Sequence, residues 1–192
     1  NAVIPMESTI IAARTRLKIF FKKIPPFLFL FRVKNRPNIL YNYSDCINDI
    51  KMNNNVYLFE GFMDVIASIK SNIKNCVASM GTALTVNQIN AIKRLTNNVT
   101  LCFDSDGPGV AATVKAIYLL CNSGMNVNVV SIPDGKDADE YLKNNGADKL
   151  HSVLVNNIIS AMEFLYLYEK KQVDFNNYNS IENFKNIIFK HF

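Results

Sequence analysis

Two aspartates one residue apart, Asp104 and Asp106, directly follow the apolar run of residues 99–103. If that run is a strand, both carboxylates lie at its carboxyl end. Like charges held this close resist joint ionisation unless a cation lies between them, and hard cations such as Mg²⁺ prefer carboxylate oxygens. The pair therefore predicts a metal site. The alternative is structural, because an aspartate at such a turn can simply cap the following helix.

Acidic residues also follow two other apolar runs. Glu60 comes after residues 56–59, and residues 127–132 are followed by Asp137 and Asp139. Because the carboxyl ends of parallel strands lie at one edge of a sheet, we expect these carboxylates to meet those of the first pair. Together they predict a centre for metal-dependent phosphoryl transfer. Asp64 follows Glu60 closely in the sequence and could belong to the same centre. Alternatively, an aspartate near a helix start could only interact favourably with the helix dipole.

The elements that must position these carboxylates alternate between short apolar runs and helical periodicity. Strands are predicted at 56–60, 76–80, 99–104 and 126–132, and helices at 62–71, 85–95, 108–122 and 137–144. The pattern predicts an α/β fold, with a parallel sheet of about four strands flanked by helices. After residue 150 the pattern is purely helical, at 153–171 and 181–189, which predicts the start of an α-helical subdomain. The predicted parts are an irregular basic lead-in (1–37), the α/β domain (38–150) and a partial helical subdomain (151–192).

Composition narrows the class of protein. With 192 residues and 49% hydrophobic content, the chain can bury one good core. The net charge of +5 is uneven, because basic residues crowd the first forty positions, and this permits a nucleic-acid partner. The four cysteines form no C-x-x-C pair, so we expect reduced thiols in a cytoplasmic protein and no zinc site. No segment is suited to a membrane, and the first residue, Asn rather than Met, indicates a fragment.

Four motifs occur in a fixed order, each at a predicted strand end. They are Glu60-Gly61-Phe62-Met63-Asp64, Ala78-Ser79-Met80-Gly81-Thr82-Ala83, Asp104-Ser105-Asp106-Gly107-Pro108-Gly109 and Asp134-Gly135-Lys136-Asp137-Ala138-Asp139. This series resembles the TOPRIM domain, in particular that of bacterial replicative DNA primases of the DnaG type. The resemblance covers about residues 38–150.

The resemblance implies roles for individual residues. Glu60 matches a glutamate that assists proton transfer or binds metal, and Asp104 and Asp106 match the metal-binding D-x-D pair. Asp137 and Asp139 match a later acidic pair of metal ligands. Supporting positions are the aspartate that closes the first motif and the turn glycines, namely Asp64, Gly61, Gly81 and Gly109. Weak phosphate or nucleic-acid contacts are expected from Arg94 and Lys136, although Arg94 at a helix end could equally favour the helix dipole.

The implied function is the synthesis of short RNA primers during DNA replication. The substrates would be ribonucleoside triphosphates on a single-stranded DNA template, and the cofactor Mg²⁺ or Mn²⁺. A replicative helicase would bind through a C-terminal region absent here, and the zinc module of such primases is also absent. Two alternatives remain: another TOPRIM enzyme, such as a metal-dependent nuclease, or a non-catalytic module that binds DNA or a protein partner.

Overall fold

The computed structural model of the chain describes residues 39–80, 83–133 and 137–191. The chain divides into two compact units, Asn1–Ile39 and Leu40–Phe192, and the described residues belong almost entirely to the second. The predicted lead-in at 1–37 therefore lies outside the described residues. Within the described part, none of the helices combines the length and apolar character needed to cross a bilayer.

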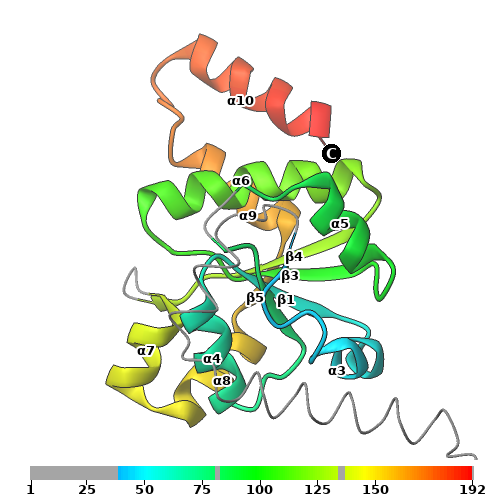
Figure 1. Ribbon diagram of the computed structural model, residues 1–192. Helices are drawn as coiled ribbons and strands as arrows, with labels where there is room; N and C mark the ends of the chain where they lie inside the picture. The colour runs from blue at the N-terminus through cyan, green and yellow to red at the C-terminus, as the bar shows by residue number, and fades with distance from the viewer. Residues whose placement is uncertain (1–38, 81–82, 134–136, 192) are drawn as a thin grey trace, which may run out of the picture. The chain divides into compact units, whose positions relative to one another are not determined.

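Helices and strands alternate through the second unit, as the sequence predicts (Figure 1). In chain order they are α3 (Ile47–Asn53), β1 (Val56–Phe59), α4 (Phe62–Lys70), β2 (Cys76–Ala78), α5 (Val86–Lys93), β3 (Asn98–Leu101), α6 (Gly107–Asn122), β4 (Asn126–Val130), α7 (Ala138–Asn145), α8 (Ala147–Asn156), β5 (Ile158–Ser160), α9 (Ala161–Lys170) and α10 (Tyr178–His191).

The strands form one sheet in the order β2-β1-β3-β4-β5. The first four are mutually parallel, with Leu58 of β1 opposite Val77 on one side and Leu101 on the other. Their carboxyl ends therefore lie at one edge, which is the arrangement that the predicted site requires. The α/β fold and the parallel sheet are confirmed.

The fifth strand corrects the expectation of purely helical structure after residue 150. Residues 158–160 form β5, which pairs antiparallel with β4, so that Ile159 lies opposite Val129. The predicted helix at 153–171 is consequently divided between α8 and α9. The last helix, α10, contacts α9, where the rings of Phe184 and Tyr166 lie 5.7 Å apart.

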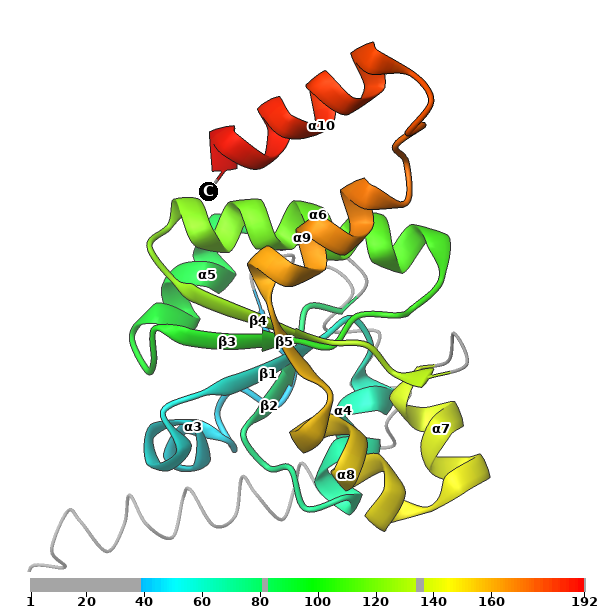
Figure 2. The same cartoon turned by 180° about the vertical axis from the view of Figure 1, so that it is seen from behind.

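Two apolar cores lie on opposite faces of the sheet because successive strand residues point to opposite sides. In β1, Val56 and Leu58 face the core that α5, α6 and α9 cover, whereas Tyr57 and Phe59 face the core that α4, α7 and α8 cover. Figures 1 and 2 show the two helical layers on either side of the strands. Helices on both faces explain why β1 and β2 are continuous buried runs rather than alternating ones.

We expect the residues after 150 to unfold together with the sheet, and Leu165 tests this. Its side chain on α9 is 5% exposed and belongs to the core formed with β1, β3 and β4. Leu165→Ala should lower the free energy of unfolding by about 2–5 kcal/mol, measured by urea denaturation. Leu167→Ala is the matched control, because Leu167 lies on the same helix and is 44% exposed. Similar small losses in both variants would contradict the expectation.

Candidate active site

Glu60 follows β1 at the carboxyl edge of the sheet. Its backbone is fixed there, because its carbonyl accepts a hydrogen bond from the backbone N–H of Met80 after β2 (3.0 Å). Burial raises the pKa of Glu60 above its ordinary value, and the charges of Asp104 and Asp106 raise it further. Oxygen Oε1 is buried and has no hydrogen-bond partner among the described residues. A buried carboxylate oxygen without a partner is costly, so this atom is suited to a proton or a cation.

Asp104 and Asp106 lie between β3 and α6, as predicted. Burial raises the pKa of Asp104, and the charges of Asp137 and Asp106 add to the effect. The carboxylate of Asp106 accepts a hydrogen bond from the backbone N–H of Gly109 (2.8 Å) and caps α6. The capping role considered for this pair is therefore present at Asp106, and it coexists with the electrostatic coupling to Asp104 and Glu60.

Gly109 lets α6 begin directly against the strand end. A Cβ atom at this position would lie 2.2 Å from the carbonyl oxygen of Asp104 and 2.8 Å from its Cβ. No side chain fits into this space without moving the helix away from Asp104. The glycine predicted to support the site thus has a steric role.

Ser105 and Lys143 contribute contacts that the sequence reasoning missed. The Ser105 hydroxyl donates a hydrogen bond to the carbonyl of Ile132 (3.0 Å), which joins the loop after β3 to the segment after β4. Lys143 forms an ion pair with Asp139 (2.5 Å) one turn earlier on α7. The i, i+4 spacing of Asp139 and Lys143 on a predicted helix could have indicated this ion pair. For Ser105, the position between the two aspartates of the D-x-D motif could have indicated a contact close to the site.

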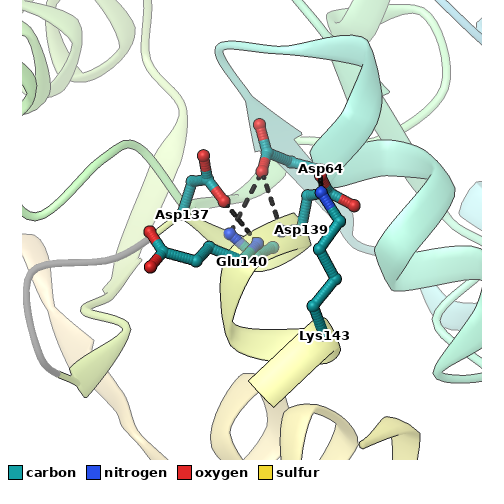
Figure 3. Close-up of polar contacts among 6 residues, drawn as sticks. Asp64, Asp137, Asp139, Glu140 and Lys143 are labelled. Carbon is teal, nitrogen blue, oxygen red and sulfur yellow. Dashed lines mark hydrogen bonds and ion pairs between the residues drawn. The ribbon is translucent and has the colours of Figure 1, made fainter. Parts of the chain in front are cut away.

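Helix α7 begins with the later acidic pair. Asp137 is its N-cap, and its carboxylate accepts a hydrogen bond from the backbone N–H of Glu140 (2.6 Å). Asp137 also raises the pKa of Asp104, so the ends of β3 and β4 are electrostatically coupled. The carboxylate of Asp139 instead faces Lys143, as Figure 3 shows.

Asp64, in the first turn of α4, reaches the same helix. It is 7% exposed, and its Oδ1 accepts hydrogen bonds from the backbone N–H groups of Ala138 (3.0 Å) and Asp139 (3.3 Å) (Figure 3). Burial, followed by the charge of Asp137, raises the pKa of Asp64 to about 6, although the two hydrogen bonds act in the opposite direction. Gly61 leaves room for this carboxylate, because a Cβ there would lie 2.7 Å from Oδ2.

The remaining predicted residues lie elsewhere. Arg94 is the C-cap of α5 and precedes β3 by a few residues, so it lies toward the amino ends of the strands, opposite the carboxylates. Gly81 and Lys136 fall outside the described residues. The roles of all three stay predictions.

The side chains are not arranged as a complete metal site. Within the described part of the chain, no three acidic, histidine or cysteine groups are placed to hold one metal ion. Asp106 and Asp137 each use one oxygen to cap a helix, and Asp139 is paired with Lys143. Yet the donor set fits a hard cation, because all of its members are carboxylates. Burial and neighbouring carboxylates raise the pKa values of Glu60 and Asp104, and one buried oxygen lacks a partner among the described residues.

The close approach at Gly109 predicts a pair of contrasting variants. Gly109→Ala should lower the free energy of unfolding by about 1–3 kcal/mol, because the added methyl group would clash with the backbone of Asp104. Gly107→Ala is the control, since a Cβ at Gly107 meets nothing within 4 Å. Its unfolding free energy, measured by urea denaturation, should stay within about 0.5 kcal/mol of the parent. Equal stability of the two variants would contradict the steric role of Gly109.

The raised pKa of Asp64 predicts a pH dependence of stability. The folded state keeps this proton up to about pH 6, whereas an ordinary aspartate loses it near 3.8. The stabilisation is therefore complete below the ordinary pKa and is lost as the pH rises through about 6. In the parent, the free energy of unfolding should fall by on the order of 2 kcal/mol over this range, and Asp64→Asn should remove this fall. The measurement compares unfolding curves of the variant and the parent between pH 4 and 7 in the presence of a chelator. Parallel pH profiles for the two proteins would contradict the assignment.

Comparison with known proteins agrees with this geometry. Residues 57–142 match the family described as Toprim-like. The chain is 40% identical over 144 residues to a DNA primase of Enterococcus faecalis, which covers 74% of this chain and 23% of the relative. It is 43% identical over 129 residues to a DNA primase of Lactococcus lactis, covering 67% and 20%. The chain thus spans less than a quarter of the length of these curated relatives.

The fold gives the same relationship. A solved structure of the DnaG primase catalytic domain bound to ssDNA matches with a TM-score of 0.67 and 27% identity, over 79% of this chain and 49% of that one. The matched family segment begins in β1 and ends in α7, so it contains every candidate carboxylate. This chain therefore carries a Toprim-like domain and is related to DNA primases of the DnaG type.

Proposed function

We propose that this chain is part of the catalytic core of a DNA primase, which joins ribonucleotides into a short RNA primer on a single-stranded DNA template. The observation that carries the proposal is the electrostatic coupling of Glu60, Asp104 and Asp106 at the carboxyl edge of the parallel sheet. The primase relatives support the choice of reaction.

Primer synthesis requires a 3′-hydroxyl to attack an α-phosphate while pyrophosphate leaves. Bound Mg²⁺ or Mn²⁺ would lower the pKa of the hydroxyl and neutralise charge on the phosphates. The residues that would hold the cation are the carboxylates of the site, namely Glu60, Asp104, Asp106, Asp137 and Asp139. We assign Asp104 the first place among them, because burial and the charges of Asp137 and Asp106 raise its pKa. Beyond the effect of burial, its own charge raises the pKa of both Glu60 and Asp64.

Glu60 is suited to a second task. Its raised pKa makes it a better proton acceptor than an ordinary glutamate, and Oε1 has no partner among the described residues with which an incoming hydroxyl would compete. We therefore assign to Glu60 the removal of the proton from the attacking hydroxyl. The template would be bound mainly through its phosphates, so binding should weaken as the salt concentration rises. A replicative helicase is the proposed partner of the longer protein.

The test is primer synthesis on single-stranded DNA with labelled ribonucleotides and Mg²⁺. The zinc module and basic subdomain of a related primase are supplied in trans. Asp104→Ala and Glu60→Ala should each reduce the product at least about 100-fold, because each removes several kcal/mol of charge stabilisation or proton transfer. Asp148→Ala, on the exposed surface of α8, is the matched acidic control and should retain activity.

Other outcomes would contradict the proposal in different ways. Mg²⁺-dependent cutting of the template, without RNA product, would identify a nuclease. Neither activity in the parent chain, with Mn²⁺ still bound, would identify a binding module that keeps the carboxylates without the reaction. RNA product that persists in both Asp104→Ala and Glu60→Ala would mean that primer synthesis does not depend on these carboxylates.

A further inference from the structure

Asp64 is a buried carboxylate whose hydrogen bonds among the described residues go to backbone amides at the start of α7, not to other side chains of the site. Two candidate metal ligands, Asp137 and Asp139, lie at that helix start. We infer that Asp64 is a positioning residue that holds the start of α7 in place and is not itself a ligand of the cation. This inference rests on the proposed function in one respect: it assumes that Asp137 and Asp139 serve the metal site.

The first step of the argument is the contact itself. Asp64 is 74 residues before Ala138, and its Oδ1 accepts the backbone N–H groups of Ala138 and Asp139 at 3.0 and 3.3 Å. These are the first two amides of α7, which have no acceptor within their own helix. A carboxylate at this end is also favoured by the positive end of the helix dipole. Asp64 therefore joins α4 to α7 through charge-assisted hydrogen bonds.

The second step is that α7 has all three amides of its first turn paired with carboxylates. Asp137 accepts the third, from Glu140 (2.6 Å). That bond lies within the helix start and cannot fix α7 relative to the sheet. The bonds to Asp64 can do so, because α4 begins three residues after β1 ends. The position of Asp137 and Asp139 is thus tied to β1, the strand that directly precedes Glu60.

The third step concerns the two oxygens of Asp64. Oδ1 is used by the two amides, and Oδ2 lies so close to Gly61 that a Cβ there would be 2.7 Å away. Asp64 is 7% exposed, so little of it is open to solvent. Figure 3 shows one oxygen of this carboxylate directed at the backbone of α7 and the other pointing away from it. A carboxylate whose Oδ1 is shared by two backbone amides of one helix start is suited to positioning that helix.

Asparagine and alanine distinguish these two roles. Asparagine keeps an oxygen that can accept both amides but loses the charge that a ligand needs, whereas alanine loses both. The experiment uses Asp64→Asn, Asp64→Ala and, as the reference for loss of a ligand, Asp104→Asn. Two readouts are made on each folded variant: hydrogen exchange of the Ala138 and Asp139 amides in a chelator, and Mn²⁺ affinity by calorimetry.

If Asp64 positions α7, Asp64→Ala should speed exchange of the two amides about tenfold. It should also weaken Mn²⁺ binding by about 10–100-fold, as the loss of a supporting contact does at metal sites. Asp64→Asn should keep slow exchange and lose less than about threefold in affinity, which is the rescue that a lost ligand would not give. Asp104→Asn should weaken Mn²⁺ binding without affecting exchange at Ala138 and Asp139.

Two results would overturn the inference. Loss of Mn²⁺ affinity in Asp64→Asn as large as that in Asp104→Asn would make Asp64 a ligand. Unaltered exchange of the two amides in Asp64→Ala would mean that Asp64 does not hold α7. If the parent protein bound no Mn²⁺, the proposed metal site would fail, and the exchange measurement would still decide the role of Asp64. Should Asp64→Ala not fold, Asp64→Asn and Asp104→Asn still separate the two roles.

Discussion

Carboxylates that repel one another are held at one edge of the sheet by the backbone amides of helix starts. Asp106 is bonded to the first turn of α6, and Asp137 and Asp64 to the first turn of α7. These amides are unpaired within their helices and carry the positive end of the helix dipole, so they offset part of the repulsion without adding a cationic side chain. The fold can therefore bring acidic groups together before any cation arrives.

This arrangement depends on how closely the helices approach the strand ends. Gly109 lets α6 start against the backbone of Asp104, and Gly61 makes room for the carboxylate of Asp64. The caps use Oδ1 of Asp106 and of Asp137 and leave the second oxygen of each carboxylate for another ligand. Helix capping and metal binding are thus compatible roles for one aspartate, although the sequence presents them as alternatives.

The strand ends could be predicted from the sequence because the evidence for them is local. The apolar runs 56–59 and 99–103 are followed at once by Glu60 and Asp104, and parallel strands bring such residues to one edge whatever the details of packing. The partners of Asp64 could not be predicted, because they lie 74 and 75 residues away in the chain. Strand β5 was missed for a different reason. Three residues between two helices show no alternation, and their isoleucines fit a helical pattern equally well.

The antiparallel strand β5 also determines where the folded unit can be cut. It covers the hydrogen-bonding edge of β4, since Val129 and Val130 face Ile159 and Ile158 across the pair. A shorter chain ending at residue 150 would keep every candidate carboxylate yet expose that edge to solvent. Uncovered edges of this kind pair with neighbouring molecules and promote aggregation. Residues beyond the matched Toprim-like segment thus cover the open side of β4, a contribution separate from the chemistry at the carboxyl ends of the parallel strands.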